Sequence, residues 1–148
     1  MNALRIEPVG DATLADWQHV HNLIIPTAPL SLDEVRERLG RNQLEVAYCG
    51  NVLVGNSTVR PPADGVATVI VRILPEHRRQ GYGAELLAGS LAVAESMGAR
   101  GLETIVLESN VDGLRFARAH GFVDEVDRYL PDGEYVAFVT LRRPFALG

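Results

Sequence analysis

The feature that most constrains this chain is an apolar stretch that ends in a proline and a basic turn with glycines. Residues 66–74, V-A-T-V-I-V-R-I-L, are rich in β-branched residues and predict a buried strand. Pro75 ends the run, the turn from Arg78 to Gly83 follows, and residues 84–97 have the apolar spacing of a helix. A helix N-terminus offers free backbone N–H groups, and glycines let a ligand approach the backbone. Together with the charge of the arginines, this order predicts a site for an anion.

The spacing of the glycines narrows the kind of anion. A mononucleotide P-loop needs Lys-Ser/Thr directly after its last glycine, whereas Gly83 is followed by Ala84. A dinucleotide-binding turn needs a third glycine three residues after the second, and Leu86 stands at that position. A nucleotide-binding domain is therefore a weak alternative. The pattern that remains is Arg-x-x-Gly-x-Gly, formed by Arg78, Gly81 and Gly83 after the apolar strand.

A second motif follows the next expected strand, residues 102–107. Asn110 is a helix-capping residue type, a short helical stretch comes after it, and Gly121-Phe122 ends that stretch. The basic glycine turn and the Asn…Gly-Phe motif at this distance resemble the GCN5-related N-acetyltransferase (GNAT) family. The resemblance extends over nearly the whole chain and is weakest over residues 1–45.

The sequence predicts an α/β chain with a mixed sheet, in one GNAT-like domain of residues 1–148. The first four strands are expected to be antiparallel, with tight turns at Gly50-Asn51 and at residues 61–65. A helix between the fourth and fifth strands implies a parallel crossover, and residues 131–133 predict a C-terminal hairpin. The resemblance implies that strands four and five splay apart around the acyl-CoA site. Strands are expected at residues 4–6, 43–49, 52–60, 66–74, 102–107, 126–129 and 135–141, and helices at 13–24, 32–39, 84–97 and after residue 110.

Four further polar residues have expected structural roles. Thr13 and Ser31 each begin a capping-box pattern at the start of a helix. His21 falls on the apolar face of the first helix, where we expect a core histidine with one satisfied ring nitrogen. Arg72 interrupts the apolar run of the fourth strand, and we expect it to form an ion pair across the sheet.

The resemblance implies acetyl-CoA as the cosubstrate, without a metal. In the family, the pantetheine arm pairs with backbone groups of the fourth strand where it leaves the fifth, which corresponds to Ile73 and Leu74. The pyrophosphate lies on backbone amides at the start of the third helix, and the Asn after the fifth strand contacts the pantetheine. The residues so assigned to the cofactor are Ile73, Leu74, Arg78, Arg79, Gln80, Gly81, Tyr82, Gly83, Ala84, Asn110 and Phe116.

The resemblance also implies an amine acceptor that attacks the thioester directly, and such an amine must lose a proton. Many family members carry a tyrosine as proton donor four residues before the Gly of Gly-Phe, and this chain has Ala117 there. Glu108, at the end of the fifth strand, and His120, a residue type suited to proton exchange near neutral pH, are the candidates for proton transfer. Ala117 keeps an alternative open, in which the chain binds acyl-CoA as a sensor or partner module without turnover.

Composition limits the partners and the location. The net charge of −5 argues against non-specific binding to nucleic acid. Cys49 is the only cysteine, which excludes an internal disulfide and fits a reducing compartment. The sequence has no apolar signal segment at its start and no run long enough to cross a membrane, so we expect a cytoplasmic protein without membrane contact. The expected acceptor is a primary amine of a small molecule or peptide, and a homodimer is plausible for so small a domain.

Overall fold

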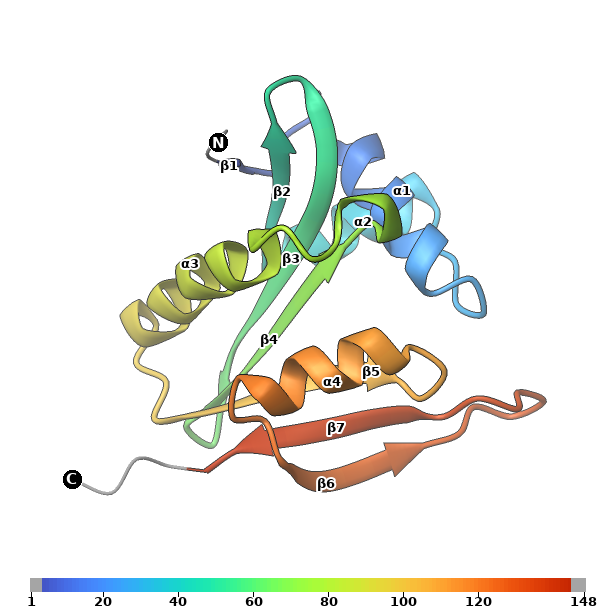
Figure 1. The fold of residues 1–148 in the computed structure, drawn as a ribbon, viewed down its shortest axis with the longest axis vertical. Coiled ribbons are helices and arrows are strands. Elements are labelled where there is room, and N and C mark those ends of the chain that lie inside the picture. Colours follow the sequence, from blue (N-terminus) through green and yellow to red (C-terminus); the bar gives the residue numbers. More distant parts are fainter. Residues whose placement is uncertain (1–3, 145–148) are drawn as a thin grey trace.

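All seven expected strands form, and they lie in a single mixed sheet. The computed structural model describes residues 4–144, and the strand order is β1-β2-β3-β4-β5-β7-β6 (Figure 1). Only β4 and β5 pair in parallel, so the expected fold class is confirmed. The strands are β1 (Leu4–Pro8), β2 (Gln43–Cys49), β3 (Val52–Ala63), β4 (Val66–Ile73), β5 (Gly101–Leu107), β6 (Asp124–Tyr129) and β7 (Phe138–Arg143). The helices are α1 (Leu14–Ile24), α2 (Leu32–Leu39), the short 3₁₀ helix η1 (Pro75–His77), α3 (Tyr82–Ser96) and α4 (Val111–Ala119).

Helices cover both faces of the sheet. Figure 1 shows α3 and α4 in front of the sheet and α1 and α2 behind it. The front core joins Leu87 of α3 and Phe122 to apolar side chains of the central strands. The rear core joins Trp17 of α1 and Val35 of α2 to side chains of β2. No helix in residues 4–144 has both the length and the apolar character needed to cross a membrane.

Several expected boundaries are wrong, and those of β3, β7 and α3 bear on the turns. Strand β3 continues through Pro61 and Pro62, because the register shifts there and prolines at an irregular strand end cost no ladder hydrogen bond. The turn is therefore confined to Asp64-Gly65, both with positive φ. Strand β7 begins at Phe138, three residues later than expected, and α3 begins two residues earlier.

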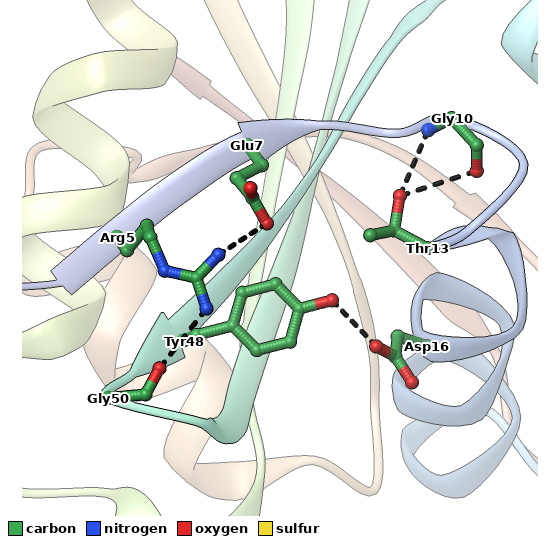
Figure 2. A network of polar contacts seen from close by, with 7 residues as sticks. All are labelled: Arg5, Glu7, Gly10, Thr13, Asp16, Tyr48 and Gly50. Atoms are coloured by element: carbon green, nitrogen blue, oxygen red, sulfur yellow. Dashed lines mark hydrogen bonds and ion pairs between the residues drawn. The ribbon is translucent and has the colours of Figure 1, made fainter.

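The capping box expected at Thr13 does not form. The Thr13 hydroxyl accepts the N–H of Gly10 at 2.9 Å instead of a helical N–H, and makes no cap. Asp16 accepts the Tyr48 hydroxyl at 2.6 Å, so it ties α1 to β2 (Figure 2). The same view shows Arg5 beside the Tyr48 ring, at 4.7 Å from its centroid. Asp16, which the sequence pattern assigns to the start of α1, therefore makes a tertiary contact with β2 instead of a cap.

The box expected at Ser31 is confirmed, because the Glu34 N–H donates to Ser31 and the Ser31 N–H donates to Glu34.

The splay between the parallel strands is the feature that creates a site. Strand β4 pairs with β5 only over Val66–Thr68 and Gly101–Glu103. Beyond these residues, β4 keeps its pairing with β3 and β5 keeps its pairing with β7, so the sheet opens between them. In Figure 1 the two strands meet at one end and diverge toward the other. The end of β4 therefore has a free backbone edge inside the molecule.

Candidate functional site

A cleft of about 410 Å³ opens at this gap, between the end of β4, the glycine turn and the facing side of α4. Most of the residues expected to bind the cofactor line this cleft, and so does His120. Leu74, Gln80 and Glu108 are not among its walls. The expected site residues that line it are Ile73, Arg78, Arg79, Gly81, Tyr82, Gly83, Ala84, Asn110, Phe116 and His120.

The glycine turn brings the start of α3 against α4. Gly81 is the N-cap residue of α3 with φ +83°, and no side chain caps the first N–H groups of the helix. A Cβ on Gly83 would lie 3.1 Å from the Phe116 ring, so glycine allows this close approach without displacing the ring. The Tyr82 hydroxyl donates to the Cys49 sulfur at 3.2 Å and anchors the turn on β2. The result is a set of uncapped N–H groups at the mouth of a cleft, which suits an anion.

Arg78 holds the cleft together across the gap. Its Nε donates to the Ile73 carbonyl at 2.9 Å, and its terminal nitrogen lies 3.2 Å from a carboxylate oxygen of Asp112 in α4. The positive charge of Arg78 is therefore already paired with the carboxylate of Asp112. Arg79 is exposed and has no ion pair within residues 4–144, so it offers the free positive charge of the turn.

The free edge of β4 presents two backbone amides. Leu74 is buried and donates its N–H to the Val54 carbonyl of β3 at 2.8 Å. Backbone groups alternate in direction along a strand, so the N–H groups of Ile73 and Val71 face the gap instead. Of the two residues expected to pair with pantetheine, the structure brings Ile73 to the cleft and keeps Leu74 in the sheet.

Asn110 both caps α4 and lines the cleft. Its side-chain oxygen accepts the Gly113 N–H at 3.0 Å and caps α4, while its side chain also lines the cleft. A Cβ on Gly113 would lie 2.5 Å from the side-chain nitrogen of Asn110. Sequence reasoning missed Gly113, although the spacing Asn-x-x-Gly at a helix start was a usable signal.

The two candidates for proton transfer differ in position. Glu108 forms an ion pair with Arg128 at 2.6 Å, and its side chain is 48% exposed. His120 lines the cleft, where its Nδ1 lies 2.9 Å from the Phe116 carbonyl and its ring packs on the Phe116 ring. In this arrangement Nδ1–H donates and Nε2 remains an acceptor. Ala117 is buried in the core and provides no donor.

Arg72 does not form the ion pair expected for it. Within residues 4–144, no carboxylate lies close enough to pair with its guanidinium. Burial, followed by the charges of Arg38 and Arg60, lowers the Arg72 pKa to about 10. Burial and the charge of Arg72 in turn lower the pKa of His21 to about 4, so this ring is neutral.

His21 is a core residue, as expected. It stacks on Trp17 with ring centroids 5.5 Å apart, and its Nδ1 lies 3.0 Å from the Asn22 side-chain oxygen.

A family model described as the acetyltransferase (GNAT) family matches residues 13–122. A search of curated proteins gave no match. Among solved structures, an N-acetyltransferase from Staphylococcus aureus is 14% identical, with a TM-score of 0.75, and the match covers 95% of this chain and 97% of that one. A ribosomal-protein-alanine N-acetyltransferase from Brucella melitensis is 19% identical, with a TM-score of 0.71 and coverage of 93% and 98%. An acetyltransferase from Bacillus subtilis in complex with CoA is 20% identical, with a TM-score of 0.69 and coverage of 97% and 100%. At these identities the structures establish the fold.

Proposed function

The chain belongs to the acetyltransferase (GNAT) family and is an N-acetyltransferase that uses acetyl-CoA, and we propose that its acceptor is a primary amine of a small molecule or peptide. In this proposal the amine attacks the thioester directly, with both substrates bound. The observation that carries the proposal is the free edge of β4 beside the uncapped start of α3. One cleft then offers groups that suit the amides of pantetheine and groups that suit its phosphates.

We propose that different groups of residues lining the cleft bind different parts of the cofactor. The N–H groups of Val71 and Ile73 would hold the pantetheine amides as a neighbouring strand would. The amides of residues 79–84 and the charge of Arg79 would hold the pyrophosphate. The Asn110 side-chain nitrogen, which the cap leaves free, would donate to a carbonyl of the cofactor. When bound, acetyl-CoA supplies an activated acetyl group.

For proton transfer we favour His120 over Glu108. The attacking amine must be neutral, and a base in the cleft helps to remove its proton. His120 lines the cleft with Nε2 free to accept a proton, whereas Glu108 is held by Arg128 outside the cleft walls. We expect His120→Gln to lower kcat about 100-fold at saturating acetyl-CoA, and Glu108→Gln to change it by less than about twofold. The reverse order of effects would assign the role to Glu108.

The experiment that tests the proposed activity has two readouts on the same protein. Acetyl-CoA is first expected to raise the melting temperature in proportion to its occupancy. A panel of amines is then incubated with acetyl-CoA while free thiol is measured. Thiol release that depends on an amine supports the proposal, whereas binding without release for any amine contradicts it and favours a sensor of acyl-CoA. A homodimer remains a prediction, which light scattering after size exclusion measures directly.

A further inference from the structure

Arg72 lies on the opposite face of β4 from the residues that pack against α3. It is the second-to-last residue of the strand and pairs with Asn56 of β3. Val71 and Ile73 pack toward Leu86 of α3, and side chains alternate along a strand, so Arg72 projects to the face covered by α1. A smaller cavity of about 40 Å³ between β4 and β5 shares Arg72 with the main cleft. Arg72 therefore lies at the gap between β4 and β5, where the cleft and the smaller cavity share it as a lining residue.

Arg72 is partly exposed at the cleft, and within residues 4–144 no carboxylate pairs with its guanidinium. The charged groups that act on it are Arg38 and Arg60, both positive, and His21 nearby is neutral. The amide oxygen of Asn56 has no hydrogen-bond donor among residues 4–144, but a neutral oxygen cannot balance a full charge. Because Arg72 lines the cleft without an anionic partner, its charge is available to an anion that binds there. The chain has a net charge of −5, yet none of the carboxylates within residues 4–144 is paired with Arg72.

A carboxylate on the second substrate would supply such an anion. The turn on the α3 side already offers uncapped amides and Arg79 to the phosphates of the cofactor. Arg72 faces the other side of the gap, toward Ile24 of α1, which also lines the cleft. The planar guanidinium binds a carboxylate through two parallel hydrogen bonds, which fixes both position and orientation.

We propose that Arg72 binds a carboxylate of the acceptor, so that the preferred substrate is a small amine that also carries a carboxylate. This inference rests on the proposed acetyl transfer and gives it a substrate class. Because Arg72 directly precedes Ile73, a carboxylate held there places the rest of a small acceptor at the open gap. Arg72 is then a residue that determines specificity, and it takes no part in proton transfer.

The test compares acids with their amides in enzymes with and without the Arg72 charge. The probes are the common amino acids, β-alanine and 4-aminobutyrate, each paired with its amide. We expect the wild type to acetylate at least one acid about 100-fold more efficiently, in kcat/KM, than the matched amide. Arg72→Met should remove this preference, and Arg72→Lys should restore part of it.

Two controls separate the possible failures. Arg60→Met removes a positive charge from the same face, at the end where the strands still pair, and should keep the preference for acids. Acetyl-CoA should stabilise wild type and Arg72→Met equally, because loss of this effect would assign Arg72 to the cofactor and overturn the inference. Calorimetry with CoA-loaded protein detects acid binding even without turnover.

Each outcome bears on one of the two proposals. Equal use of acids and amides by the wild type, or no binding of any acid, overturns the role of Arg72 while amine-dependent thiol release still supports the proposed function. Binding of an acid that depends on Arg72, without thiol release from any amine, supports the carboxylate site and contradicts the proposed transfer.

Discussion

His21 gives this protein a specific dependence of stability on pH. Burial and the charge of Arg72 lower its pKa from 6.5 to about 4 in the folded state, while the unfolded chain binds a proton near pH 6.5. The unfolded state therefore gains protons first as the pH falls, and its free energy decreases relative to the folded state. The contribution of His21 is complete above pH 6.5 and is lost progressively toward pH 4, by up to about 3 kcal/mol.

Urea denaturation of wild type and His21→Phe between pH 7 and pH 4.5 measures this contribution. The phenylalanine keeps an aromatic ring on Trp17 and has no proton to gain. We expect the free energy of unfolding to fall less steeply in the variant than in the wild type over this range. Parallel curves would show that His21 titrates alike in both states.

Asn110 caps α4 and, in our proposal, also contacts the cofactor, and two substitutions separate the two roles. Asn110→Asp keeps an oxygen for the Gly113 N–H but replaces the side-chain nitrogen by an anion, so stability should hold while acetyl-CoA affinity falls at least about tenfold. Asn110→Ala should lose the affinity and also about 1 kcal/mol of stability. Melting curves and calorimetric titration with acetyl-CoA measure the two effects. Wild-type affinity in the aspartate variant would remove Asn110 from the cofactor site.

At the scale of elements, two glycines of α3 should respond to alanine with opposite signs. A methyl group on Gly83 meets the Phe116 ring at 3.1 Å, so the ring must give by a few tenths of an ångström, and we expect this to disturb the cleft wall. Gly89 is exposed with nothing within 4 Å, so alanine there only improves helix propensity. We expect Gly83→Ala to lower stability and acetyl-CoA affinity, and Gly89→Ala to raise stability by up to about 1 kcal/mol without changing affinity. Thermal melts with and without acetyl-CoA provide both readings.

The elements also show how far local sequence determines structure. Ser31 caps α2 as its pattern predicts, because both partners of that box lie within four residues and nothing else competes for them. Thr13 has a similar local pattern, but Tyr48 takes the Asp16 carboxylate from 32 residues away. The succession of strands along the chain and the glycine turn were predictable, because β-branched runs and turn residues act locally. The contacts of Asp16 depend on how α1 packs against β2, which no window of sequence contains.

At the scale of the whole molecule, some features of the candidate site were predictable from the sequence and others were not. The glycine turn and its uncapped N–H groups were predictable, since they come from one continuous segment. Glu108 looked suitable because it ends β5, but Arg128 of β6 pairs with it. The missing partner of Arg72 was not predictable either, because a strand pattern suggests a partner without showing which residues surround the position. Residues whose roles depend on neighbouring elements are those for which the sequence expectations failed.

The open sheet leads to a prediction about hydrogen exchange that distinguishes three residues near the end of β4. The amides of Val71 and Ile73 face the gap, where β5 has already turned away, whereas the Leu74 amide donates to Val54. Amides without a partner exchange quickly even in a folded protein, and those in a closed ladder exchange slowly. In the free protein we therefore expect Leu74 to be protected and the other two to exchange much faster.

Acetyl-CoA should reverse this difference if its pantetheine arm completes the sheet. Exchange at Val71 and Ile73 should slow by at least about tenfold at saturation, as each amide gains an acceptor, while Leu74 should change little. Residue-resolved exchange by NMR, with and without acetyl-CoA, makes the measurement, and Leu74 serves as the internal control. A uniform slowing of all three would indicate only general stabilisation by ligand. Unchanged rates at Val71 and Ile73 with bound acetyl-CoA would show that the cofactor does not pair with β4, because a paired amide exchanges slowly.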